Sequence, residues 1–270
     1  MRRLSLLLGA GCTLVFLAYG VFFLVDWLAV EHKTETRTFA AVPTVHLDVD
    51  GGGAVRVVGD GGDRIRVDLR WREGVQRASV SARLDGDRLV VHTGCPALVN
   101  AFCIAGATVH VPKGTVVDGG GSSPIQVLDV AGPVDLGVSN GSVRIEGGRG
   151  DVEVRGDNGE VTVVGGQGPL RLSTDNGSIT TDAVRADRVD ARTDNGRIRL
   201  DLAIAPRSVV ARADNGGITV LVPDDGQPYA VSARSDNGSV DTPVATTTDA
   251  ARTIDAAADN GSISVRYRPS

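Results

Sequence analysis

Two cysteines and two histidines lie close enough in the sequence to suggest metal or redox chemistry: His92, Cys95, Cys103 and His110. Their spacing is a poor match to zinc motifs, in which the ligands come as closely spaced pairs. The N-terminal sequence indicates export, and in an oxidising compartment two cysteines this close together readily form a disulfide. We therefore predict a Cys95–Cys103 disulfide, with a metal site or two free thiols as the alternatives. The third cysteine, Cys12, lies in an apolar N-terminal segment.

The rest of the sequence shows no catalytic signature. It has no glycine-rich phosphate loop before a helix, and the four histidines fall in no nucleophile motif. The net charge of −5 gives no reason to expect nucleic-acid binding. We expect a protein that is not an enzyme and that uses no cofactor and no metal. A carbohydrate-active β-helix enzyme is the weaker alternative, by analogy of fold alone.

A short phrase ending in Asn-Gly occurs seven times in the second half of the chain, at intervals of 18 to 23 residues. In six copies an Asp directly precedes the Asn. A fixed phrase with a period of about 20 residues indicates a repeat architecture in which each copy is one structural unit. The asparagines are Asn140, Asn158, Asn176, Asn195, Asn215, Asn237 and Asn260.

Small or apolar residues alternate with polar ones on both sides of each Asn-Gly. Before Asn176, for example, Leu170, Leu172 and Thr174 occupy every second position, and Ile179 resumes the alternation after it. A period of two is typical of a strand with one buried face. The small or apolar residues lie at even offsets before the Asn and at odd offsets after it. One residue of the alternation is lost at the Asn-Gly, which indicates a corner there. We expect its Gly to supply a positive φ.

Two architectures fit this pattern. An Asn-Gly between alternating strands is typical of a β-hairpin, so an array of hairpins is one alternative. We favour an all-β solenoid with coils of about 20 residues, because the corner is constant while the return loop varies in length. Like residues then stack on like at about 4.8 Å. We expect the asparagines, in the inward phase, to form a ladder of side-chain amides from coil to coil.

The stack also predicts columns of charge on its surface. The aspartates before the asparagines would form a column of like charges, which is unfavourable on its own. Four arginines two residues earlier on the same face are expected to offset this repulsion: Arg155, Arg192, Arg212 and Arg234. A calcium ladder along the aspartates is the alternative. Four of the copies read Asn-Gly-Ser, which is formally an N-glycosylation signal, although the corner already explains them.

The N-terminal part of the chain is organised differently. Arg2 and Arg3 precede 22 residues without a charge, Leu4 to Val25, which would extend about 33 Å as a helix. We expect residues 1–30 to be an uncleaved transmembrane anchor with a cytoplasmic N-terminus and the bulk of the chain outside the cell membrane. A cleavable signal peptide is the alternative. We expect a polar linker over residues 31–43, a β part that caps the solenoid over 44–117, and the solenoid itself over 118–270.

The sequence resembles a bacterial family of adhesin-like proteins of unknown function with β-strand repeats. The resemblance covers about residues 40–270, and its carrying features are Val45–Val49, Gly53–Val57 and the recurring Asp-Asn-Gly-Ser-Ile phrase. It implies an exported, membrane-anchored interaction module without catalytic residues, whose partner is cell-wall polymer or an envelope protein. An accessory subunit of an envelope sensor or transporter is the alternative function.

Overall fold

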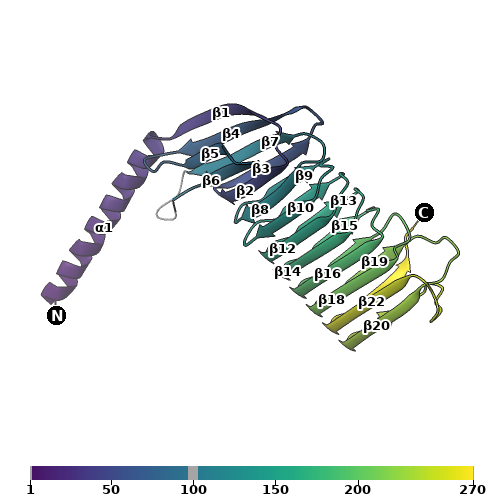
Figure 1. Ribbon diagram of the computed structural model, residues 1–270. Coiled ribbons are helices and arrows are strands. Elements are labelled where there is room, and N and C mark those ends of the chain that lie inside the picture. The colour runs from purple at the N-terminus through teal and green to yellow at the C-terminus, as the bar shows by residue number, and fades with distance from the viewer. Residues whose placement is uncertain (1, 97–102, 270) are drawn as a thin grey trace.

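Two long β-sheets enclose a continuous apolar core, and one helix extends from their N-terminal end (Figure 1). This computed structural model describes residues 2–96 and 103–269; within helix α1 (Arg2–Leu28) the described side chains are those of residues 12, 13 and 15–28.

Every strand belongs to one of the two sheets. In spatial order the 12-stranded sheet contains β1 (Glu31–Ala40), β4 (Arg64–Glu73), β7 (Ile104–Val111), β3 (Gly52–Gly59), β9 (Ile125–Leu128), β11 (Val143–Glu146), β13 (Val161–Val164), β15 (Ile179–Asp182), β17 (Ile198–Asp201), β19 (Ile218–Val222), β23 (Ile263–Tyr267) and β21 (Val240–Asp241). The 11-stranded sheet contains β20 (Ala230–Asn237), β22 (Thr253–Asn260), β18 (Ser208–Asn215), β16 (Arg188–Asn195), β14 (Leu170–Asn176), β12 (Val152–Asn158), β10 (Val134–Val138), β8 (Val116–Gly121), β2 (Thr44–Asp50), β6 (Arg88–Gly94) and β5 (Ser79–Asp85).

Each repeat contributes one strand to each sheet, and neighbouring repeats pair in parallel with like positions in register. Val154, Leu172 and Ala191 lie opposite one another in β12, β14 and β16, and all three are buried. Beyond the corner, Val161 and Ile179 are paired and buried in the same way. The inward positions are those that the period of two predicts. The solenoid is therefore confirmed, and the array of antiparallel hairpins is wrong.

The corner asparagines form the predicted ladder, but on the outside of the molecule. The Asn158 Nδ2 donates to Asn140 Oδ1 at 3.3 Å, and Asn176 and Asn195 continue the line at 3.1 and 3.0 Å. All seven side chains are exposed, so the inward placement is wrong. The pairing register skips the Asp before each Asn, which shows that the chain has already left the plane of the strand there.

The corner glycines are needed for a reason other than the one expected. Of the seven, Gly216 and Gly261 have a positive φ, and at 158° both are nearly extended. A Cβ on Gly196 would instead lie 1.9 Å from the carbonyl oxygen of Gly177 in the neighbouring coil, and one on Gly216 would lie 1.6 Å from that of Gly196. The coils approach so closely at this column that no side chain fits.

The order of the coils in space departs from the order in sequence at both ends of the stack. β22 pairs with β18 on one side and with β20 on the other, so the last coil lies between its two predecessors. The amide ladder follows the same order, because Asn260 donates to Asn215 and Asn237 donates to Asn260. At the N-terminal end, β2 and β3 likewise lie between β6 and β7 on one side and β8 and β9 on the other.

Antiparallel strands close the N-terminal end of both sheets. β4 and β1 follow β7 in one sheet, and β5 follows β6 in the other. The linker expected over residues 31–43 is therefore wrong for Glu31–Ala40, which forms β1. The partly buried side of β1 carries Lys33, Glu35 and Arg37, and the Arg37 Nη1 donates to the Ala82 carbonyl oxygen at 2.9 Å. Inward-pointing charges of this kind protect an edge strand from further pairing.

Helix α1 ends against the loop between β4 and β5. Asp26 is buried, and its Oδ1 accepts a hydrogen bond from the Val75 N–H at 2.7 Å. The side chains of the first part of the expected anchor, residues 4–11, lie outside the description. In the part of the chain that the structure describes, no helical stretch reaches the length and apolarity needed to cross a bilayer.

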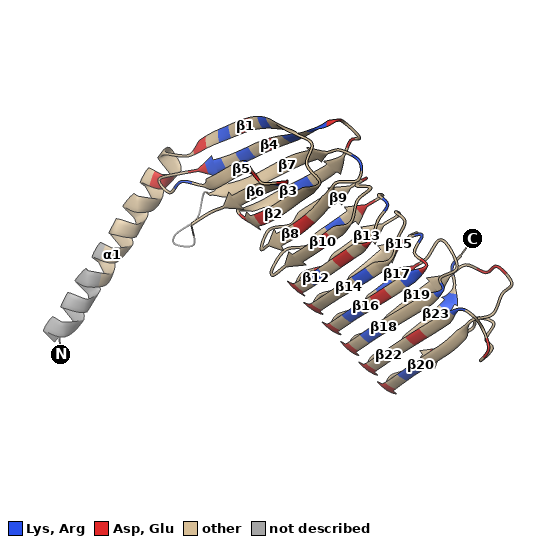
Figure 2. Cartoon of the chain, in the orientation of Figure 1, with Lys and Arg blue, Asp and Glu red and all other residues tan. Residues whose placement is uncertain are grey.

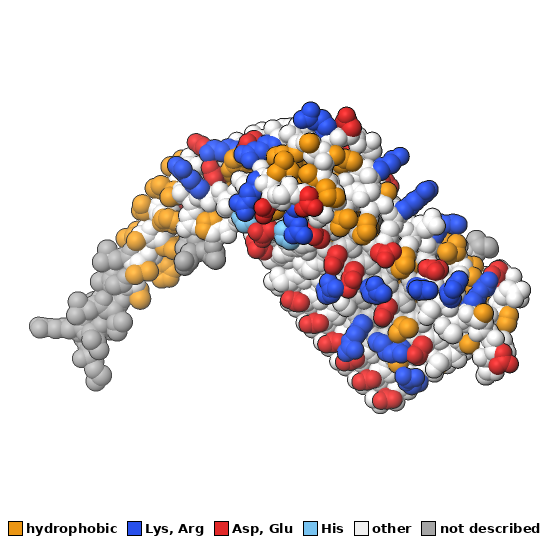
Figure 3. Space-filling view, viewed as in Figure 1, with side chains coloured by type: hydrophobic (Ala, Val, Ile, Leu, Met, Phe, Trp, Pro, Cys, Tyr) orange, Lys and Arg blue, Asp and Glu red, His pale blue; other side chains and the backbone are white. Residues whose placement is uncertain are grey.

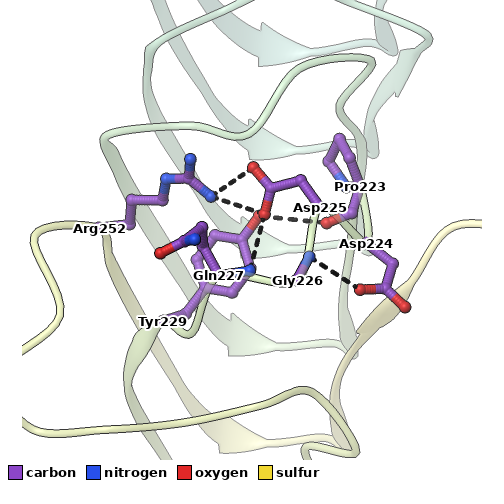
Figure 4. A network of polar contacts seen from close by, with 7 residues as sticks. All are labelled: Pro223, Asp224, Asp225, Gly226, Gln227, Tyr229 and Arg252. Atoms are coloured by element: carbon purple, nitrogen blue, oxygen red, sulfur yellow. Dashed lines mark hydrogen bonds and ion pairs between the residues drawn. The ribbon is translucent and has the colours of Figure 1, made fainter.

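A polar network fixes the loop that leads into β20 (Figure 4). The Arg252 Nη1 donates to both carboxylate oxygens of Asp225, at 2.9 and 2.7 Å, and the guanidinium lies 5.8 Å from the centre of the Tyr229 ring. The hydrogen bond from Arg252 lowers the pKa of Asp225, and burial raises the pKa of Tyr229. The Tyr229 hydroxyl donates to the Pro223 carbonyl oxygen at 3.3 Å. The network thus ties the loop before β20 to the segment before β22.

Replacing Val161 by Asp places an unpaired charge in the core, and we expect it to lower the free energy of unfolding by about 3–5 kcal/mol. Thr162→Asp places the same charge on the outer side of β13 and should change this free energy by less than about 0.5 kcal/mol. Urea unfolding of both variants, followed by circular dichroism, measures the difference. Equal unfolding midpoints would contradict the inward assignment.

The glycine column gives a second stability prediction. Gly196→Ala forces a methyl group against the next coil, and we expect it to lower the free energy of unfolding by at least about 2 kcal/mol. Gly137→Ala is the matched control, because a Cβ there meets nothing within 4 Å and its φ is unrestricted. Thermal unfolding of the two variants compares them. A Gly196→Ala protein as stable as the control would show that the coils are not in steric contact at the corner.

Candidate functional site

The structure separates the cysteines and histidines that the sequence places together. Cys95 and Cys103 form the predicted disulfide, with Cα atoms 5.9 Å apart. The His92 Nδ1 lies 2.8 Å from Asp48 on the 11-stranded sheet, whereas His110 lies on β7 in the other sheet. Among the described residues, no group of three or more His, Cys, Asp or Glu side chains is placed to hold a metal ion.

The charge columns of the solenoid lie on the outer face of the 11-stranded sheet (Figure 2). The column of aspartates beside the asparagines runs along one edge of the solenoid, where Figure 3 shows acidic side chains in a line. Its members are Asp157, Asp175, Asp194, Asp214, Asp259 and Asp236. Three of the four arginines pair mainly with carboxylates on the side away from the aspartate column. Arg155 contacts Asp135 at 2.9 Å, and Arg212 and Arg234 both approach Asp255.

Arg192 is the arginine that pairs with this aspartate column, at 3.6 Å from Asp194. The expectation that the four arginines would neutralise the aspartates is therefore wrong for the other three. The reason is that the strands before the corners carry a second row of acidic side chains, such as Asp135 and Asp255. These carboxylates lie nearer to the guanidinium groups than the aspartate column does. The aspartate column remains a solvated, strongly acidic ridge.

A row of positive charge lies on the N-terminal cap. In β4 the buried residues Ile65, Val67 and Leu69 alternate with outward side chains, and four of the five outward residues are arginines. The same period of two that buries one face of the strand therefore aligns positive charge on the other. We call this row the basic cap face; it consists of Arg64, Arg66, Asp68, Arg70 and Arg72.

Asp68, the one acidic residue of the basic cap face, already has partners within the chain. The Thr36 hydroxyl donates to Asp68 Oδ1 at 2.7 Å, and the Arg66 Nε lies 3.3 Å from Asp68 Oδ2. Arg64 and Arg70 have no acidic partner among the described residues. Their charges are therefore available to an external anion, because nothing nearby in the described chain neutralises them.

A shallow groove of about 340 Å³ crosses the basic cap face next to Arg70. It is lined by Ile104, which lies opposite Arg72 and is 43% exposed, and Gly106 leaves the position opposite Arg70 without a side chain. Cationic groups beside an exposed apolar side chain suit an anionic ligand that also has an apolar surface. The lining residues are His32, Lys33, Thr34, Arg70, Trp71, Arg72 and Ile104.

Lys33, on the inward side of β1, forms an ion pair that crosses to β4. Its Nζ lies 2.6 Å from Glu73 Oε1 and 3.1 Å from Glu31 Oε2, and the Ala78 N–H donates to Glu73 Oε2 at 2.8 Å. The hydrogen bond from Lys33 lowers the pKa of Glu73, against the effect of burial, and the same bond raises the pKa of Lys33. The charges therefore persist at neutral pH and hold β1 in place.

The basic cap face was not predicted from the sequence. Its signal was present as the alternation Arg-x-Arg-x-Asp-x-Arg-x-Arg over residues 64–72, which places all five residues on one side of a strand. The groove had no such signal, because Arg72 and Ile104 come together only through the antiparallel pairing of β4 with β7.

The ion pair predicts a dependence of stability on pH. Because the folded-state pKa of Glu73 lies below its ordinary value of 4.5, its charge stabilises the fold above about pH 4.5. This contribution is lost as the pH falls through the lowered folded-state value. We expect Glu73→Gln to have a lower free energy of unfolding than the wild type at neutral pH. This difference should disappear in acid, as measured by urea unfolding at a series of pH values. A difference that stays constant would contradict the role of the charge.

Comparison with one solved structure supports the fold. A putative adhesin from Parabacteroides distasonis ATCC 8503 is similar over 87% of this chain and 97% of its own, with a TM-score of 0.52 and 12% identity. A putative adhesin from Bacteroides fragilis NCTC 9343 has a TM-score of 0.49 and 13% identity over 88% of this chain and 97% of its own.

No curated protein matches the sequence. Residues 108–266, from β7 to the last strand, match the family described as Toastrack DUF4097. This span holds the parallel coils, the amide ladder and the glycine column, and it covers more than half of the chain. The protein therefore belongs to the Toastrack DUF4097 family.

Proposed function

We propose that this protein is an adhesin-like interaction module of the bacterial cell envelope, which binds an anionic envelope polymer through the basic cap face. The observation that carries the proposal is the row of arginines on β4, two of which lack an acidic partner in the described chain, beside a groove lined by the exposed Ile104. Phosphate and carboxylate groups of wall polymers are the ligands that arginine side chains bind best, because the planar guanidinium can donate two parallel hydrogen bonds.

We further propose that α1 anchors the module in a membrane, with the sheets outside the cell. In support, the described apolar side chains of α1 point into solvent: Val15, Phe16 and Leu17 are 69%, 76% and 61% exposed. Apolar exposure of this extent on one helix is typical of a surface that contacts lipid or another protein. Three of the groove residues, His32 to Thr34, follow α1 within six residues of Leu28. An anchored helix would therefore hold the groove near the membrane surface.

The test is co-sedimentation of the full chain, kept in a mild non-ionic detergent, with isolated cell-wall sacculi over a salt series. The chain should be tested whole, since a fragment that begins at residue 40 would lack β1. We expect saturable binding that weakens as salt rises. Arg64→Ser combined with Arg70→Ser should weaken it by roughly twofold to thirtyfold, because each exposed ion pair contributes about 0.2–1 kcal/mol.

Arg155→Ser combined with Arg171→Ser is the matched control, because it removes the same charge from the outer face of the other sheet. We expect this variant to bind like the wild type. Absence of binding by the wild type, or equal loss in both variants, would overturn the assignment of the basic cap face as the binding surface.

A further inference from the structure

A histidine lies next to the basic cap face and contacts one of its arginines. His110 on β7 lies directly opposite Arg66 on β4, and its side chain is 20% exposed. The Arg66 Nη2 lies 2.9 Å from the His110 Nε2, and the His110 Nδ1 lies 3.3 Å from Asp60 Oδ2. The Nε2 also lies 3.9 Å from Asp68 Oδ2. The imidazole therefore has a guanidinium on one nitrogen and a carboxylate near each.

The contact with Arg66 assigns the protonation state of His110. A guanidinium has N–H donors and no acceptor, so the His110 Nε2 must accept the hydrogen bond from Arg66 with its lone pair. The ring proton then lies on Nδ1 and faces Asp60. Arg66 has a second partner within the chain, because its Nε lies 3.3 Å from Asp68 Oδ2. In this structure His110 is neutral and Arg66 is engaged.

Charged residues surround His110 on both flanking strands and on the turns beside them. The acidic ones are Asp60 and Asp68, and the basic ones are Arg56, Arg64, Arg66 and Lys113. Arg56, on β3, donates to Gln126 Oε1 at 2.8 Å, and Lys113 lies beside the turn after β3. Among the described residues, Arg66 is the cation that bonds to the imidazole.

A second proton on the imidazole would end this arrangement. An imidazolium donates from both nitrogens, so Arg66 loses its acceptor and meets a like charge. The new Nε2–H has the Asp68 carboxylate within 3.9 Å, and the Nδ1–H keeps Asp60. His110 then competes with Arg66 for Asp68, and the guanidinium turns outward into solvent. Histidine is the side chain whose charge ordinarily changes between about pH 5 and 8.

We propose that protonation of His110 strengthens the binding of anionic polymer to the basic cap face, because it adds one charge beside the face and releases Arg66 from its partners in the chain. This inference rests on the proposed function, since it concerns regulation of the same surface. Residues two apart on a strand lie about 7 Å from each other. The released Arg66 therefore joins Arg64 as a pair of neighbouring guanidinium groups that one polymer chain can contact.

Dextran sulfate is the probe, because its sulfate groups stay ionised throughout this range and a pH dependence then comes from the protein. We expect the full chain, in a mild non-ionic detergent at constant ionic strength, to bind it roughly twofold to thirtyfold more tightly at about pH 5.5 than at about pH 8. Isothermal titration calorimetry measures the two affinities. His110→Gln keeps an oxygen acceptor for Arg66 but takes no proton. It should bind like the wild type at the higher pH and lose most of the increase in acid.

Three further variants separate His110 from the other titrating groups. His92→Gln is the matched control, because this histidine also pairs with an aspartate but lies on the other sheet, and it should keep the full increase. His32→Gln removes a histidine opposite Arg72, at the far end of the row, and should keep the larger part. Arg66→Gln should cost more affinity at the lower pH than at the higher one, because the guanidinium reaches the polymer only after its release.

Long-range proton–nitrogen NMR spectra of the imidazoles test the assignment without any ligand. We expect neutral His110 to carry its proton on Nδ1. A proton on Nε2 instead, equal affinities at both pH values, or an increase that survives in His110→Gln would each overturn the role of His110 and leave the basic cap face as the binding surface. Absence of binding at both pH values would overturn the proposed function together with it.

Discussion

Parallel pairing of successive coils in one register is the constraint on which the rest of this structure depends. Each residue lies about 4.8 Å from its counterpart in the next coil, so a position is acceptable only if its side chain tolerates a copy of itself. An amide does so because it donates and accepts, which gives the Asn ladder. Glycine does so because two side chains would collide at the corner. Carboxylates do so only where water solvates them, at the exposed edge.

The solenoid itself could be predicted from sequence because alternation and a fixed corner report directly on local structure. The reason for the glycine could not, since close approach between coils is a property of the stack and not of the corner. The partners of Arg155 and Arg212 could not be predicted either. Sequence shows which residues share a face but not which of two flanking acidic rows lies nearer to a guanidinium.

The spatial order of the last coils could not be predicted from the sequence for a related reason. Asn215, Asn237 and Asn260 are chemically equivalent, so the motif cannot specify which coil stacks on which. The increase in spacing to 22 and 23 residues was the available signal, since only a longer connection lets a strand skip a place in the sheet. β1 was missed because its inward side carries Lys33, Glu35 and Arg37, which removes the apolar alternation that indicates a strand. The basic cap face shows the same limitation, because a row of arginines is recognised as a surface only once the strand beneath it is known.

The position of the last coil between its two predecessors has a consequence for how the chain folds as it is synthesised. Coils up to β18 and β19 can add to the stack one by one as the chain emerges from its N-terminal end. β20 emerges next, but its native neighbour β22 is made after it. Until then the edge of β18 offers β20 an equivalent ladder of hydrogen bonds in the wrong place. The growing chain must therefore hold its penultimate repeat unbound, or release it again, until the final residues have been made.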